Sequence, residues 1–191
     1  PMPTTSQYLA AHASVNFAGK DKLSTNNKIT FTSKIEQKPT ELFLKDYKPP
    51  SHLIDRTDLT FDLIAEDNVV VISKLKIHPN PKSDESPNSI TLKGATEAAP
   101  EGSETPTMEL LEVKVNGQKL SKDDYTRDSG ELVIKNLPDN EFTLETKTRI
   151  NPKENRSLNG LYTSGGKFAT QCESEGFRNI TFYLDRPDVM S

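Results

Sequence analysis

The stretch HLIDRTDLTFDLIAEDNVVVISKLKIHP, residues 52–79, decides the fold of this 191-residue chain. Its apolar residues recur at alternate positions, which places one set on a single face of an extended chain: Leu59, Phe61, Leu63, Val69, Val71, Leu75 and Ile77. A period of two is typical of a half-buried β-strand. The polar residues 66–68 separate the two halves and can close a hairpin. The stretch therefore predicts two paired antiparallel strands.

Further strands follow along the chain. SITLK (residues 89–93) is a short apolar run, and MELLEVKVNGQKL (residues 108–120) places Asn116-Gly117, a dipeptide that tolerates positive φ, between two alternating segments. GELVIKNL and EFTLETKTRINP add two more strands, the second with one apolar or β-branched face: Phe142, Leu144, Thr146, Thr148 and Ile150. No helix of three turns can be read between residues 45 and 155. Short strands joined by turns predict an all-β, antiparallel sandwich or open barrel.

The chain divides into an extension and one domain. Residues 1–44 are rich in Thr, Ser, Asn and Lys without a strand or helix period, and we expect this extension to be largely disordered. Residues 45–191 form the β-domain. Within it, GATEAAPEGSETPT (residues 94–107) carries little to bury, and we expect a mobile loop insertion there.

Composition excludes several classes of function. A formal net charge of −4 and a pI near 5.5 give no electrostatic reason to expect nucleic acid or an anionic membrane as a partner. No apolar run approaches the ~18 residues of a membrane span. The single cysteine gives no support for a disulfide framework, which favours a cytoplasmic or organellar compartment over secretion.

The residues of this chain alone do not predict a catalytic centre. His12, His52 and His78 are isolated, and HExxH and GxSxG motifs are missing from the sequence. We therefore expect this chain to bind no zinc by itself and to contribute no catalytic residue. Cys172 has no partner at ligand spacing and is interpreted as a small buried hydrophobe. The sequons at Asn155 and Asn179 are patterns frequent by chance, and glycosylation is not favoured.

One segment near the C-terminus holds unusual chemistry. In TQCESEGFRNITFYLDRPDV, residues 170–189, the runs FATQC and NITFYL favour strands, while Glu173, Glu175 and Arg178 surround Gly176 at a turn or bulge. Two interpretations stay open. The acids are solvated or paired with Arg178, or Glu173 is held at the end of the sheet as an anchor for a cation.

A resemblance bears on that choice. NGLYTSGGKFATQCESEGFRNITFYLDRPDV (residues 159–189) closely resembles a signature of the aminopeptidase N, or alanyl aminopeptidase, family of zinc gluzincin peptidases, in its bacterial and protozoan-parasite branch. DYKPPSHLIDRTDLTFDL and GELVIKNLP resemble upstream segments of the same branch. The resemblance covers about residues 46–189, with residues 94–107 as an insertion.

The resemblance implies a fold and a role. The family's first domain is a β-rich, saddle-like sheet assembly that leans against a thermolysin-like catalytic domain. The resemblance also implies that this domain has further strands beyond Ser191. It implies that Gln171 lines the pocket for the first side chain of a peptide substrate and that Glu173 binds the free α-amino group. The zinc ligands and the catalytic residues belong to family regions beyond this chain, so we expect the chain alone to be inactive.

A different class of function stays as the alternative. A free-standing β-sandwich that acts as a non-catalytic interaction module would show the same strand pattern. A reading frame that continues into a zinc-binding HExxH helix would distinguish the two.

Overall fold

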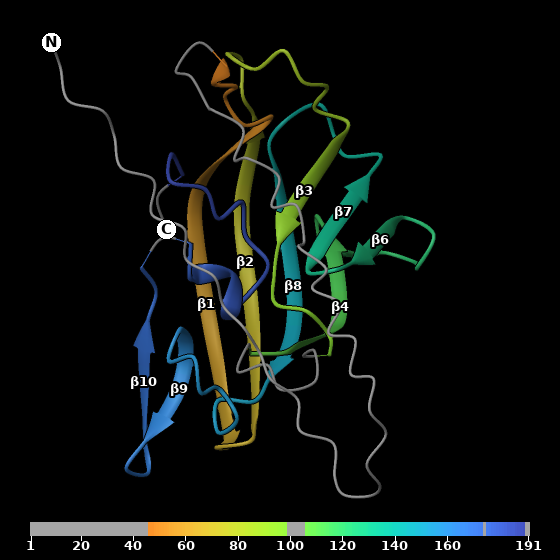
Figure 1. Cartoon of the computed structure of the whole chain (residues 1–191). Coiled ribbons are helices and arrows are strands. Elements are labelled where there is room, and N and C mark those ends of the chain that lie inside the picture. Colours follow the sequence, from red (N-terminus) through yellow and green to blue (C-terminus); the bar gives the residue numbers. More distant parts are fainter. Residues whose placement is uncertain (1–45, 99–105, 174, 190–191) are drawn as a thin grey trace, which may run out of the picture. The chain divides into compact units, whose positions relative to one another are not determined.

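The computed structural model describes residues 46–98, 106–173 and 175–189, and every strand in it lies in one compact unit, Phe43–Ser191 (Figure 1). The strands run in chain order as β1 (His52–Ala65), β2 (Asn68–Pro79), β3 (Ser89–Lys93), β4 (Met108–Val115), β5 (Gln118–Lys119), β6 (Tyr125–Asp128), β7 (Glu131–Lys135), β8 (Phe142–Ile150), β9 (Gly160–Ser164) and β10 (Lys167–Gln171). A 3₁₀ helix, η2 (Phe177–Asn179), follows them. Within the described residues, no helix is long and apolar enough to cross a membrane.

The largest sheet has five antiparallel strands in the order β1-β2-β8-β4-β5. Its inner face carries the alternating residues that the sequence predicted: Val69, Val71, Leu75 and Ile77 of β2, and Phe142, Leu144, Thr146, Thr148 and Ile150 of β8, are all buried. The edge strand β1 is less covered, and Leu63 remains 49% exposed. On β1, the predicted apolar face is therefore only partly covered, with Leu59 and Phe61 half-buried.

Two tight turns fix the register of this sheet. Glu66 and Asp67 form the turn between β1 and β2, as predicted. Asn116 (φ 50°) and Gly117 (φ 77°) form the tip of the β4–β5 hairpin, and both residues have the positive φ that a type I′ turn requires. The Asn116 side-chain oxygen accepts a hydrogen bond of 2.8 Å from the amide of Thr143, which ties the turn to β8.

A second layer covers the large sheet. The three-stranded sheet β3-β7-β6 lies in front of β8 and β4 in Figure 1, and its inward residues Ile90, Leu92, Leu132 and Ile134 belong to the same buried cluster as those of β2 and β8. The sheets are open and antiparallel. This confirms an all-β fold with one apolar core between layers.

The prediction of a strand at NITFYL, residues 179–184, is wrong. The segment begins within η2, and only Tyr183 pairs with a strand, in an isolated antiparallel bridge to Lys93. Consecutive residues of the segment are buried on all sides rather than on alternate faces: Ile180, Thr181, Phe182, Tyr183 and Leu184. A short apolar run that is buried throughout has no period from which strand and coil can be told apart.

Two predictions about domain organisation fall largely outside the described residues. Residues 1–44 lie there entirely. For the loop 94–107, the described part is its base, where Thr96 and Thr107 form a parallel bridge and Ala95 is buried. The mobility of residues 94–107 stays a prediction.

Candidate functional site

The candidate residues follow the hairpin of β9 and β10. These two strands form a separate antiparallel pair in which Gln171, the last residue of β10, stands opposite Gly160, the first residue of β9. Gly165 (φ 57°) and Gly166 (φ 73°) make the connecting turn. The chain leaves the hairpin at Gln171 and enters the loop with the mixed charges.

The first three candidate residues face solvent. Gln171, Cys172 and Glu173 are all exposed. The prediction that Cys172 is a buried hydrophobe is therefore wrong, because β10 ends one residue earlier and no strand partner covers the thiol. Among the described residues, no hydrogen bond or ion pair engages the carboxylate of Glu173.

Arg178 organises the other charges of the loop. Its Nε donates to Oδ2 of Asp185 over 2.5 Å, and its Nη2 donates to the backbone carbonyl of Asp185 over 3.1 Å. The backbone amide of Arg178 donates to the same carboxylate over 3.2 Å. Nη2 also lies 2.5 Å from Oε2 of Glu175. Burial opposes the charge of the guanidinium, but the two carboxylates outweigh it and raise the pKa of Arg178.

The structure thus separates the two glutamates. Glu175 is neutralised by Arg178, which is the pairing that the sequence left open, whereas Glu173 has no such partner in the described part of the chain. Asp185 is the residue that sequence reasoning missed, although its side chain is only 9% exposed and it accepts three hydrogen bonds from Arg178. Its place in DRPDV, seven residues after Arg178, gave no local signal of this contact.

Close packing around two glycines fixes the position of the loop that carries Glu173. A Cβ atom on Gly176 would lie 2.2 Å from Oδ1 of Asn159 and 2.7 Å from the carbonyl oxygen of Glu173. Gly160, with φ of 92°, approaches η2 in the same way, and a Cβ there would lie 2.6 Å from Cβ of Asn179. The start of β9 and the loop that holds Glu173 therefore touch at positions where only glycine fits.

The described residues do not form a metal site of their own. They contain no cluster of three or more His, Cys, Asp and Glu side chains that could hold an ion. His52 is buried edge-on against Phe142, and His78 lies 3.0 Å from the carboxylate of Asp55.

The first sequon does not present an accessible amide. Asn155 is 4% exposed, and its side-chain nitrogen donates to the carbonyl oxygens of Asn159 and Leu161, each over 2.9 Å. These bonds hold the loop before β9 and leave the amide unavailable to a modifying enzyme without local opening.

Comparisons with known proteins bear on the class of this domain. No family model matches the chain. Aminopeptidase N of Escherichia coli K12 is 38% identical over 156 residues, which cover 81% of this chain and 16% of that protein. Aminopeptidase N of Caulobacter vibrioides is 36% identical over 153 residues, which cover 80% of this chain and 16% of that protein.

Solved structures agree with these relatives. Legionella pneumophila aminopeptidase A, solved in complex with aspartic acid, superposes with a TM-score of 0.64 at 30% identity over 76% of this chain and 16% of that one. An M1 zinc metallopeptidase from Deinococcus radiodurans, solved with a Tyr-Ser-Ala substrate, has a TM-score of 0.53 at 14% identity over 73% of this chain and 30% of that one, which supports the fold alone.

The antiparallel layers define an all-β domain of the kind present in an aminopeptidase of known structure. The chain belongs to the aminopeptidase N family. It spans 16% of the length of the two relatives named above.

Proposed function

We propose that this chain is the N-terminal β-domain of a zinc-dependent aminopeptidase, a hydrolase that removes N-terminal amino acids from peptides. In this proposal the domain recognises the N-terminus of the substrate, and the catalytic domain of the same polypeptide supplies the chemistry. The 36–38% identity to aminopeptidase N over about four fifths of the chain supports the assignment.

Glu173 is proposed to bind the free α-ammonium group of the peptide. The observation that carries this role is the contrast between an exposed Glu173 without a charged partner in the described residues and a Glu175 that Arg178 neutralises. A protonated α-amine, with a pKa near 8, needs an ionised acceptor. At ~4 Å and an effective dielectric near 20, such a pair is worth on the order of 4 kcal/mol before desolvation. A requirement for this charge restricts cleavage to the N-terminus.

Gln171 is proposed to line the pocket for the first side chain of the substrate. It lies two residues before Glu173, at the end of β10, and its uncharged side chain is exposed. An amide can shape a pocket and donate or accept hydrogen bonds, but it cannot replace the counter-ion of an ammonium group.

The partner proposed for this surface is the catalytic domain. An apolar hollow of about 300 Å³ lies beside the candidate loop, lined by Phe61 and Leu63 of β1 and by Leu161, Phe168, Ala169 and Thr170 of the hairpin. Contact with a second domain would remove this apolar surface from water and hold Gln171 and Glu173 against the substrate site.

Zinc would be bound by the parent enzyme and not by this chain. The described residues contain no ligand cluster, and in this proposal the metal ligands belong to the catalytic domain, where zinc would polarise the peptide carbonyl and activate water. What the chain itself would do is orient the substrate amine.

The domain assignment is tested by comparing the parent protein with the 191-residue chain. We expect the parent to retain zinc after dialysis and to hydrolyse alanyl and arginyl amides, and the chain alone to do neither. Metal analysis and a chromogenic amide assay give both readouts. Zinc-dependent turnover by a homogeneous sample of the chain, or a parent protein without peptidase activity, would overturn the proposal.

A further inference from the structure

The backbone groups along one edge of strand β3 are hydrogen-bonded to β7. Ile90 and Leu92 stand opposite residues of β7, and the amide of Gly94 donates to the carbonyl oxygen of Gly130 over 2.7 Å. In an antiparallel ladder the backbone groups of alternate residues face the same neighbour. The backbone groups of residues 90, 92 and 94 therefore point toward β7.

The other edge of β3 is paired at its last residue only. Lys93 and Tyr183 exchange two backbone hydrogen bonds, of 2.7 Å and 2.9 Å. By the same alternation, the N–H and C=O groups of Thr91 and Ser89 point to this side. No other strand pairs with them in the described part of the chain.

The segment after Tyr183 turns away before it can extend this ladder. Asp185 would stand opposite Thr91 if the antiparallel register of Lys93 and Tyr183 continued. Instead, Asp185 has φ of 21°, and both its carboxylate and its carbonyl oxygen accept hydrogen bonds from Arg178. The ion pair that shapes the candidate site thus also ends the ladder and leaves a gap beside β3.

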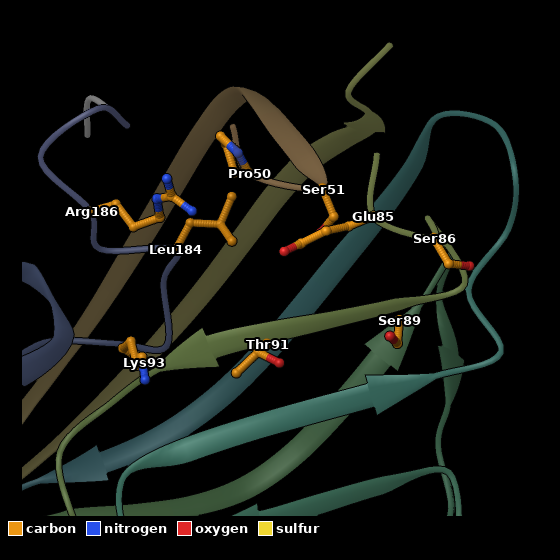
Figure 2. Close-up of a pocket in the computed structure, with 9 residues that line it drawn as sticks. All are labelled: Pro50, Ser51, Glu85, Ser86, Ser89, Thr91, Lys93, Leu184 and Arg186. Atoms are coloured by element: carbon orange, nitrogen blue, oxygen red, sulfur yellow. The ribbon is translucent and has the colours of Figure 1, made fainter. Parts of the chain in front are cut away.

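The gap is an open cavity of about 460 Å³ (Figure 2). Ser89 and Thr91 line it along β3, and Leu184 and Arg186 of the C-terminal segment line it on another side. Its lining is mixed in polarity and offers no unpaired cation, because Lys93 pairs with Glu131 and Arg186 pairs with Asp188. This lining suits a polar extended backbone better than an apolar helix or an anion.

Charge distribution also distinguishes this edge from that of β1. Soluble proteins protect exposed strand edges with charged residues, proline or bulges. Charged side chains follow one another along β1, at Asp55, Arg56, Asp58 and Asp62, and a register shift lies between Ile54 and Arg56. The two open positions of β3, Ser89 and Thr91, are small and uncharged.

We propose that the open edge of β3 receives an extended strand from the part of the parent polypeptide that lies outside these 191 residues. The strand would run antiparallel to β3 and pair with the backbone of Thr91 and Ser89. The proposal rests on the proposed function in one respect, that the chain is one section of a longer aminopeptidase; the relatives that match it extend over about six times the matched length, as the 16% coverage shows.

Hydrogen exchange of single amides tests the pairing. In the parent protein we expect the Thr91 amide to exchange at least roughly a hundredfold more slowly than in the 191-residue chain, because a ladder hydrogen bond must open before exchange. The Lys93 amide is the internal control, since Tyr183 protects it in both samples. Equal exchange of Thr91 in both samples would overturn the proposal. Protection that appears in the chain alone would also overturn it, and its dependence on concentration would identify a second copy as the occupant.

A pair of substitutions gives an independent readout. Thr91→Pro removes the outward N–H and should lower the thermal midpoint of the parent while leaving that of the chain unchanged. Thr91→Val keeps the N–H and should change neither. Equal effects of Thr91→Pro on parent and chain would contradict the pairing. Zinc content and peptidase activity of the unmodified parent distinguish a failure of the strand pairing from a failure of the proposed function. A protected Thr91 amide in a parent protein without peptidase activity would refute the enzyme assignment and support the strand pairing.

Discussion

Arg178 and Asp185 form the ion pair around which the candidate site is built, with Nε of Arg178 2.5 Å from Oδ2 of Asp185. The guanidinium also reaches the backbone carbonyl of Asp185, so the pair fixes both a side chain and the direction of the chain. Glu175 shares the same guanidinium. The arrangement leaves Glu173 as the loop carboxylate that can receive a cation from outside.

Asp185→Ala should destabilise the domain. It leaves a half-buried guanidinium without its more buried carboxylate partner, and we expect a loss of about 1–3 kcal/mol in the free energy of unfolding, below the range for fully buried pairs because Arg178 is 27% exposed. Urea denaturation of the 191-residue chain measures this loss. Glu175→Ala removes the more exposed pair and should cost under about 1 kcal/mol. Equal losses for the two variants would show that the Asp185 pair does not anchor the loop.

Gly176→Ala should displace the loop that carries Glu173. The new methyl group would overlap Oδ1 of Asn159 and the carbonyl of Glu173, so we expect a loss of about 1–3 kcal/mol in stability and a fall in parent kcat/KM with zinc retained. Gly117→Ala is the matched control, because it strains a positive φ at a distant hairpin tip with open space around it. That variant should lose stability and keep its activity. Full activity of Gly176→Ala at unchanged stability would contradict the packing argument.

The sequence predicted the strands in which apolar and polar residues alternate, and one of the turns between them. The alternation in β2 and β8 and the Asn116-Gly117 turn were sufficient, because one face of each strand is buried and the turn needs residues that accept positive φ. The segment 179–184 was misread as strand because all its neighbours cover it. The burial of Cys172 was inferred from residue type, which does not reveal where β10 ends.

The candidate site was predictable in composition but not in pairing. Glu173, Glu175 and Arg178 stand close together in the sequence, yet nothing local indicated which acid Arg178 would take. The pairing of Arg178 depends on Asp185, which follows the buried segment 179–184 in the chain. That segment runs beside β3, where Tyr183 pairs with Lys93, and this brings Asp185 into contact with Arg178. Contacts of this kind come from tertiary packing and leave no sequence period.

Gln171 substitutions should change the preference for the first residue of the substrate. Replacing Gln171 with Ala or Glu alters the shape or charge of the proposed pocket, and we expect the ratio of kcat/KM between two substrates with different first side chains to change by roughly tenfold, the scale of modest pocket changes. The ratio between unblocked and N-acetylated substrates should stay constant, because Gln171 does not carry the counter-ion. A change confined to that second ratio would assign amine recognition to Gln171 instead.

The anchor role of Glu173 is the central claim, and its substitution in the parent enzyme tests it most directly. The measurement is kcat/KM for an unblocked dipeptide amide with Glu173→Ala, alongside bound zinc and the matched variant Glu175→Ala. We predict that Glu173→Ala loses well over tenfold, which corresponds to more than about 1.4 kcal/mol of transition-state binding, with zinc unchanged and Glu175→Ala only mildly affected. An unchanged kcat/KM in Glu173→Ala would contradict the account and leave the loop as a solvated turn.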